Sequence, residues 1–485
     1  MRALIVCLLA ACAAAPAAGW DVSGSNRASL WAATEHGTGL AYLDRFDLRA
    51  AGDLPGGLSV DLGLRYLADQ EQWDDPTIMH GIAKRYAAVR RKEVSARIGT
   101  YHAALGRGLL LNCVDEPRVK VDRDLDGLLV DAAWGGLLEG RLLTGQARQN
   151  SRPLDTTRTF SGGQVRLTPV PFLAVGAGYL RANAGGRLSD PSFGQPVEET
   201  FGPNLALSLG PVDLYGEYAR RHRYGYLDPS LGWVGMDDPK GDGLYGSASL
   251  ALAGLGLVAE GKRYRRLASA VNAPPACNRD GRLIGDGDDE YGFGIDGTSA
   301  PLVGLELHGN YSWARDSAGL RRWEDNFAEL RWDAARTVVL TAEARARTEQ
   351  WLQPDIPLKK YKGATLGATW RYRPGRSAGA AFGADIFDNA YLDGPLAYRE
   401  LHGEIVWAPL PWAGLSLSAD RADKRLSEYD DQRDWGRAAV RIQPADNQTL
   451  NLSFGKSKGG LVCSNGFCRY EPSFKGFKAD WEWRF

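Results

Sequence analysis

The sequence predicts an all-β fold: a single antiparallel up-and-down barrel that crosses a membrane with about 24 strands, within a range of roughly 22 to 26. Two observations predict it. Segments of about ten residues alternate apolar and polar side chains, which is the period of a strand with one lipid-facing side. Between these segments, short turns rich in glycine and proline alternate with long polar loops. In an up-and-down barrel this alternation places the turns at one end and the loops at the other.

Composition is compatible with such a barrel. The chain has 485 residues, 24% of them charged, and its mean hydropathy is -0.31. Only alternate residues of a barrel strand face lipid and the loops are polar, so these values agree with a membrane protein. Beyond the N-terminal segment, no apolar run is long enough for a membrane helix. The net charge of -1 gives no indication of a nucleic-acid partner.

The N-terminus has the features of a secretory signal: Arg2, a short apolar stretch and the processing site APA at 15–17. We therefore expect residues 1–17 to be removed and residues 18–485 to form one barrel. The segment LAAC at 9–12 also fits a lipoprotein signal, although so few residues before the cysteine would make that signal unusually short.

Several predicted strands show the period of two clearly. In VVLTAEARART, which starts at residue 338, Val338 and Leu340 share one face, and Val339 and Thr341 share the other. The same alternation returns at 58–65, 94–101, 303–310 and 450–454.

Turns and loops are assigned by composition. The predicted turns are at 52–57, 91–92, 135–136, 169–171, 210–211, 253–255, 299–301, 334–336, 373–376, 408–411 and 444–447. The predicted long loops include 69–80, 184–199, 222–242, 267–286, 349–361 and 456–472. The even strand number puts both termini on the turn side, which is periplasmic in an outer-membrane barrel. Residues 104–125 are the least strand-like stretch, and we expect them to fold into the lumen.

The last nine residues, FKADWEWRF, alternate apolar and charged side chains and end on Phe485. With the signal-like start MRALIVCLLAACAAAPA, this ending resembles bacterial outer-membrane β-barrels. The resemblance implies that Trp481, Trp483 and Phe485 form the C-terminal signal recognised by the barrel-assembly machinery, and that the outer-membrane lipid of a Gram-negative cell surrounds the protein. GTYHAALGRGLLL from 99 and GGLVCSNGFCRYEPSFKG from 459 are similar to segments of large barrels without an assigned function.

Two alternatives concern the architecture. A soluble β-propeller has blades of similar period, but the chain has no WD or kelch signature. Aromatic residues beside the turns predict an interfacial girdle, although strands favour aromatic residues in any case. These residues are Trp134, Phe172, Trp332, Tyr372, Trp407 and Trp412.

Charged residues recur at positions that would line the lumen. The carboxylates are Asp61, Glu139, Asp213, Glu217, Glu260, Glu306, Glu343 and Asp420. The basic residues are Arg65, Arg97, Arg141, Arg221, Lys262 and Arg345. They form either a transverse field that orders polar solutes or a ladder of ion pairs between neighbouring strands. Mixed signs argue against strong ion selectivity.

Cysteines in an exported chain predict disulfides. Cys463 and Cys468 enclose the turn-forming segment SNGF, and Cys113 and Cys277 are then left to pair by elimination. A metal site at Cys463 and Cys468 is the alternative, but no further cysteine or histidine stands at zinc-like spacing.

Cofactor and enzyme motifs are weak. Asp122, Asp124 and Asp126 precede Gly127 as in a calcium loop, but Ala133 stands where the bidentate glutamate is required. An ordinary solvated turn explains these residues better than a calcium loop does. We predict no cofactor, no resident metal and no enzymatic activity.

Three functions fit the predicted fold. The first is a porin-like channel that passes a solute or polymer through a polar, mixed-charge lumen. The second is a sheath around a partner protein that fills or caps the lumen, for example a cytochrome of an electron conduit. The third is a barrel enzyme at the outer rim. Since barrels of 16 to 18 strands already leave an aqueous channel, a barrel of about 24 strands requires something that narrows it.

Overall fold

A computed structural model describes residues 20–33, 39–69, 79–116, 121–149, 152–153, 159–183, 197–223, 226–228, 232–234, 240–269, 271–284, 289–350, 359–391, 394–426, 432–464, 467–471 and 473–485. The predicted signal segment 1–17 lies outside this range. Among the residues that the structure describes, no helix has the length and apolar character needed to cross a membrane.

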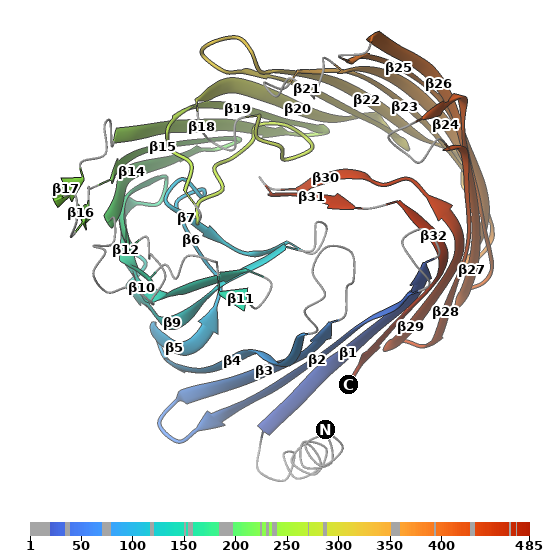
Figure 1. The fold of residues 1–485 in the computed structure, drawn as a ribbon. Helices are drawn as coiled ribbons and strands as arrows, with labels where there is room; N and C mark the ends of the chain where they lie inside the picture. Colours follow the sequence, from blue (N-terminus) through green and yellow to red (C-terminus); the bar gives the residue numbers. More distant parts are fainter. Residues whose placement is uncertain are drawn as a thin grey trace.

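The wall is a closed antiparallel barrel of 24 strands, which confirms the predicted fold class and strand number. Each strand pairs with its neighbours along the chain, and β1 closes the ring by pairing with both β2 and β32 (Figure 1). The wall strands are β1 (Trp20–Ala33), β2 (Gly39–Leu54), β3 (Leu58–Asp69), β4 (Met79–Arg91), β5 (Val94–Tyr101), β9 (Val121–Trp134), β10 (Leu138–Gln149), β12 (Thr159–Val170), β13 (Leu173–Asn183), β14 (Val197–Leu209), β15 (Val212–Arg223), β18 (Lys240–Leu252), β19 (Leu255–Arg265), β20 (Glu290–Leu302), β21 (Leu305–Arg315), β22 (Arg322–Ala335), β23 (Val338–Gln350), β24 (Lys359–Arg373), β25 (Arg376–Tyr391), β26 (Gly394–Leu410), β27 (Ala413–Leu426), β28 (Gln432–Ala445), β29 (Gln448–Ser457) and β32 (Phe474–Arg484).

Tight turns join the strands at the end where both described termini lie. Every predicted turn falls between consecutive wall strands, within a few residues of its predicted position. Gly56 and Gly57 of the first turn both have positive φ, as do Gly135 and Gly136, because hairpin turns of this kind need left-handed residues. The connections at the other end of the barrel are mostly longer. One exception is residues 316–321, which alone join β21 to β22.

Apolar side chains cover the outside of the wall. Leu366, Phe382, Leu401 and Phe454 lie on four strands and are 62% to 67% exposed. Side chains alternate across a strand, so these residues define the outer face and their sequence neighbours face the lumen. An exposed apolar band around a closed barrel is the surface that contacts lipid.

Aromatic residues flank this band at the turn end. Of the predicted girdle residues, Trp134, Phe172, Trp332, Trp407 and Trp412 are all about half exposed. Tyr372 instead donates a hydrogen bond to the Ala408 carbonyl, and the neighbouring Trp370 is exposed in its place.

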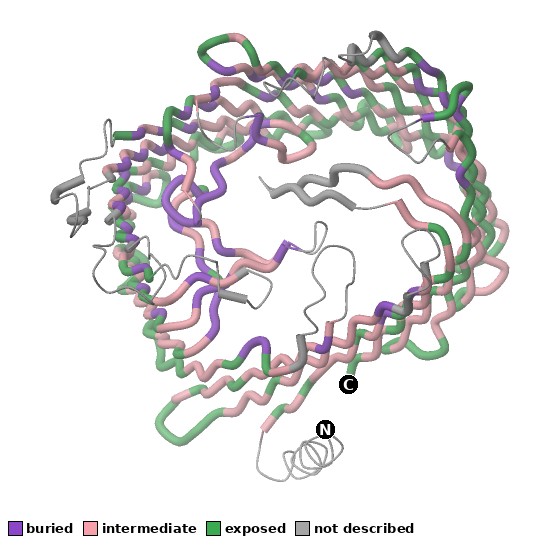
Figure 2. Tube along the Cα trace, viewed as in Figure 1, coloured by how far each residue is buried: buried purple, intermediate pink, exposed green. Residues whose placement is uncertain are grey.

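Short strands lie inside the ring. β6 (Ala103–Leu105) pairs with β7 (Leu111–Cys113), and β8 (Asp115–Glu116) pairs with the start of β9. Viewed down the barrel, β6 and β7 lie within the ring of wall strands, and so does the hairpin of β30 (Gly460–Ser464) and β31 (Phe467–Glu471) (Figure 1). Buried residues gather in the segments inside the ring near β6 and β7 (Figure 2). Of the predicted lumen segment 104–125, residues from Val121 onward belong instead to wall strand β9.

The remaining short strands lie near the loop end. β11 (Arg152–Pro153) pairs with the end of β10. The hairpin of β16 (Tyr226–Asp228) and β17 (Gly232–Val234) lies outside the ring (Figure 1).

Candidate functional site: the constricted lumen

Two loops meet inside the barrel to form one body, which we call the lumen insert: residues 102–116 together with 267–269 and 271–284. The Asn112 amide donates to the Val271 carbonyl at 2.7 Å, and the Asn272 side chain donates to the Leu109 carbonyl at 3.1 Å. Because these bonds satisfy backbone groups of both loops, the two loops are fixed to each other.

An apolar core joins the lumen insert to the wall. Leu105, Leu109, Leu111 and Leu267 are fully buried. They belong to one cluster with wall residues of β5, β9, β10, β12, β13, β15, β18 and β19, among them Tyr101, Leu129, Leu143, Phe160, Leu180, Ala219, Tyr245 and Tyr264. Burial of this apolar surface stabilises the lumen insert against eight of the 24 wall strands.

Glu217 of β15 anchors the tip of the lumen insert. Its carboxylate accepts hydrogen bonds from the Arg107 amide at 2.6 Å and from the Tyr215 hydroxyl at 2.8 Å. Gly106 has a φ of 63°, and a side chain there would collide with the Glu217 carboxylate. The Gly106 amide donates to Gln164 of β12 at 3.0 Å. Glu217 is one of the residues predicted to line the lumen, and its carboxylate binds the backbone of the lumen insert there.

A second anchor holds the other loop to β22 and β23. Asp280 forms ion pairs with Arg345, at 2.9 Å, and with Arg347. Asp325 lies between the same two arginines and is 2.7 Å from Arg345. Arg282 pairs with Glu349 at 3.1 Å. Hydrogen bonds to charged groups contribute about 1.5 to 3 kcal/mol each, so together these ion pairs hold the loop firmly to β22 and β23.

Arginines of the second anchor also stack on aromatic rings. The Arg279 guanidinium lies 3.4 Å from the centre of the Phe327 ring, and that of Arg347 lies 4.4 Å from the centre of the Trp323 ring. Trp323 is fully buried, so its ring forms a fixed platform for this contact.

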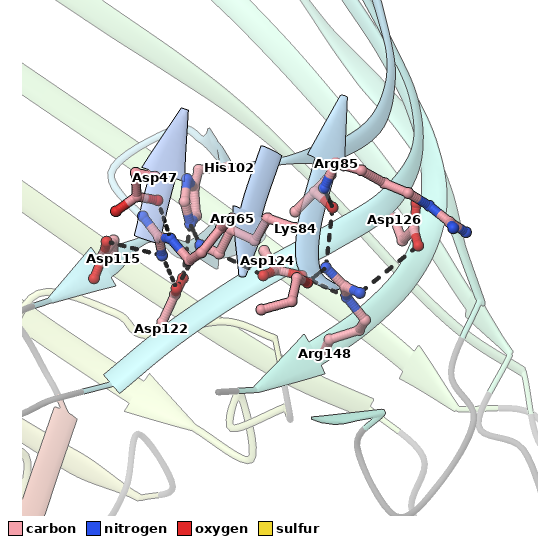
Figure 3. A network of polar contacts seen from close by, with 12 residues as sticks. Asp47, Arg65, Lys84, Arg85, His102, Asp115, Asp122, Asp124, Asp126 and Arg148 are labelled. Carbon is pink, nitrogen blue, oxygen red and sulfur yellow. Dashed lines mark hydrogen bonds and ion pairs between the residues drawn. The ribbon is translucent and has the colours of Figure 1, made fainter. Parts of the chain in front are cut away.

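A charged network links β2, β3, β4, β9 and β10 beside the lumen insert (Figure 3). Asp122 contacts Lys84, Arg65 at 3.0 Å and His102 at 2.9 Å. Asp124 contacts Arg148 at 2.8 Å. The sequence analysis missed Lys84 and Arg148, because their role depends on strand register, which no local motif reveals.

The structure does not fit the calcium alternative. Asp122, Asp124 and Asp126 lie on strand β9, not in a loop. Ligand atoms of His102, Asp122 and Asp124 lie within 4.8 Å of one another, a spacing that suits a cation. Lys84 is already 3.5 Å from Asp124 and closer to Asp122, so its ammonium group supplies the positive charge at this position.

Most predicted lumen residues meet a partner on the adjacent strand. Arg141 pairs with Asp131 at 2.6 Å, and Glu306 pairs with Arg331 at 2.9 Å. The predicted residues that form such ion pairs are Asp61, Arg65, Glu139, Arg141, Arg221, Lys262, Glu306 and Arg345. These contacts match the ladder interpretation, because each joins neighbouring strands.

The other predicted lumen residues behave differently. Glu260 accepts a hydrogen bond from Tyr245. Arg97 stacks on an aromatic ring instead of meeting a carboxylate. Within the described part of the chain, Asp213, Glu343 and Asp420 form no ion pair, and Asp213 and Glu343 are exposed.

The predicted disulfide between Cys113 and Cys277 is not formed: both residues are free thiols. They lie in different surroundings: Arg123 is the nearby cation at Cys113, and Lys262 is the one at Cys277. Burial raises the pKa of each thiol to about 12. Cys463 and Cys468 are backbone partners in the β30–β31 hairpin, but their side chains lie outside the described residues.

The predicted assembly residues lie on the strand that closes the barrel. Trp481 is 41% exposed on the outer face, and the Trp481 and Trp483 rings stack with centres 6.5 Å apart. Phe485 stacks on Phe46 of β2 with ring centres 6.0 Å apart.

No family model and no curated protein matches the chain. Among solved structures, the P pilus usher (PapC) translocation pore is 10% identical, with a TM-score of 0.47, and the match covers 96% of this chain and 99% of that one. The copper transporter OprC is 12% identical, with a TM-score of 0.46 and coverage of 96% and 80%. A BenF-like porin from Pseudomonas fluorescens Pf-5 is 9% identical, with a TM-score of 0.39 and coverage of 96% and 98%. By its own closed strand order and apolar outer face, the chain is a large β-barrel with the surface of a membrane-spanning one.

Proposed function

We propose that the protein is a channel of the bacterial outer membrane that passes small polar solutes, with its turns and both termini in the periplasm. The observation that carries the proposal is the lumen insert. It fills one side of a barrel too wide to be selective by itself and is held there by hydrogen bonds, ion pairs and an apolar core.

The opposite side of the lumen supports this function. Arg437 and Arg441 of β28 and Lys478 of β32 alternate with outward apolar residues and line a cavity of about 680 Å³. Arg437 and Arg441 are exposed. The solute path therefore runs between the lumen insert and this charged wall.

Conductance in planar lipid bilayers tests the proposal. We expect the purified barrel to give stable single-channel currents in KCl. Arg437→Glu reverses a charge on the exposed wall and should shift the reversal potential in a salt gradient toward cation selectivity. Arg336→Glu makes the same change in an exposed turn outside the lumen, and screening beyond about 10 Å should leave its reversal potential near that of the wild type.

A folded barrel that carries no ionic current would contradict the channel. Equal reversal potentials for the wild type and Arg437→Glu would contradict the assigned path, since the solute would then avoid this wall.

A further inference from the structure

Arg97 of β5 faces the lumen, forms no ion pair with the described residues and has a buried side-chain nitrogen. Its guanidinium carbon lies 3.6 Å from the centre of the Tyr86 ring. Its Nε is buried and has no hydrogen-bond partner among the described residues. A guanidinium stacked on a ring keeps its edge available for an anion, and an unpaired buried nitrogen has a free-energy cost that a nearby negative charge offsets.

The surroundings hold the Tyr86 ring in place as a platform. A side chain at Gly63 would collide with this ring, so the glycine allows the ring to lie flat against the wall. The Tyr86 hydroxyl donates to Asp61 at 3.3 Å. Asp61 in turn accepts two hydrogen bonds from Arg49, at 2.9 Å and 3.0 Å. Arg97 is therefore positioned by its neighbours while its own charge is not matched by any of them.

Arg97 lines two cavities on the inner wall. One is about 560 Å³ and the other is about 540 Å³. The basic residues of the larger one are Arg45, Arg49, Arg65, Lys84, Arg97 and Arg484. Among its described lining residues, carboxylates are carried by the Asp47 side chain and by the terminal Phe485. The other five basic residues each form an ion pair with a carboxylate, so Arg97 supplies the unmatched positive charge of this cavity.

The position of Arg97 along the channel is also suited to binding. β5 runs from the turn end to Tyr101, after which the lumen insert begins. Arg97 lies between the two, in the vestibule on the turn side of the constriction. A solute that crosses the constriction meets this residue directly before or after it.

We propose that Arg97, stacked on Tyr86 and without an ion-pair partner, forms a binding site for an oxyanion, a carboxylate or phosphate group of the solute. The proposal rests on the proposed channel function and names the solute class. Arg97 supplies two directed N–H donors to the anion, and Tyr86 sets the plane of the guanidinium.

Current block tests the site. Citrate or inorganic phosphate is added separately to the wild-type channel in KCl, and the concentration that halves the current is measured. We expect Arg97→Gln to raise this concentration about tenfold for at least one of the two anions, because a charge-assisted contact is lost. Arg97→Lys keeps the charge but lacks the planar guanidinium. Its half-blocking concentration should therefore lie between those of the wild type and Arg97→Gln.

Arg331→Gln is the matched control. Arg331 faces the lumen from β22 and is paired with Glu306, so the change removes the same charge at a distance from Arg97. For this variant, the anion concentration that halves the current should stay within about twofold of the wild-type value, because the lost charge lies beyond the screening length from Arg97. Equal weakening in Arg331→Gln and Arg97→Gln would overturn the site and leave a general charge effect. Block unchanged in Arg97→Gln would also overturn it, with the channel intact, whereas absence of KCl current refutes the channel itself.

Discussion

Cys113 and Cys277 belong to one apolar core yet remain separate thiols. Their pKa is raised from 9.0 to about 12, because burial disfavours the thiolate. Since the thiolate is the reactive form, the folded barrel should alkylate at these residues at least about tenfold more slowly than the urea-unfolded chain at pH 9. Peptide mass spectrometry after iodoacetamide treatment measures this. A cross-linked pair of peptides in a non-reducing digest would contradict it.

At the residue scale, the sequence revealed which positions carry charge but not which charges meet. Asp61 follows a predicted turn, and its period places it on the polar face. Its partners Arg49 and Tyr86 lie on two other strands, and only the register brings them together. The flat Tyr86 ring depends on Gly63, a strand glycine with no local signal for that purpose. The site at Arg97 was therefore out of reach of sequence reasoning.

At the element scale, the lumen insert depends on a few polar contacts at its tip. Glu217→Ala removes the carboxylate that binds the Arg107 amide. This loss costs about 1.5 to 3 kcal/mol locally, so the open form of the tip should become roughly ten to a hundred times more populated. Trypsin should then cleave after Arg107 faster by a similar factor in the detergent-solubilised barrel.

Glu306→Ala is the control for this experiment. Glu306 is an exposed lumen carboxylate paired with Arg331, away from the lumen insert. Cleavage after Arg107 should keep its wild-type rate in this variant. If Glu217→Ala also keeps that rate, the apolar core alone holds the lumen insert in place.

Elements were predictable where they are periodic. Strand and turn positions follow from the period of two and from the glycine and proline residues, and the 24 strands confirm both. The association of the two loops was not predictable. Residues 104–125 differ from a strand pattern and were expected in the lumen, but nothing in 267–284 indicates that its backbone bonds to Asn112. Contacts between irregular loops leave no repeating pattern in the sequence from which they could be predicted.

At the scale of the whole molecule, the barrel closes between its first and last strands. The Gly24 amide donates to the Phe485 carbonyl at 2.8 Å, and the Phe485 amide donates to the Gly24 carbonyl at 3.0 Å. Deleting Phe485 removes both bonds and the ring on Phe46. We expect a loss of about 2 to 4 kcal/mol and a smaller folded fraction. The heat-modifiable band in semi-native gels measures that fraction.

Arg484→Ala is the control for this truncation. Its side chain is 72% exposed and pairs only with Glu482 among the described residues, so its loss should change the folded fraction little. Equal folded fractions for the truncated and wild-type chains would show that the terminal residue does not stabilise closure.

The lumen insert joins residues far apart in the chain: Asn112 and Ala273, which its side chain contacts, are 161 positions apart. The wall strands between them, from β9 to β19, form one continuous part of the sheet. The seam between β1 and β32 is not needed for this contact. The lumen insert can therefore form without the pairing of β1 with β32. A sheet that has not yet closed can already hold the segment that narrows the lumen. A chain arrested before closure would consequently expose less of its interior than an empty cylinder of the same size.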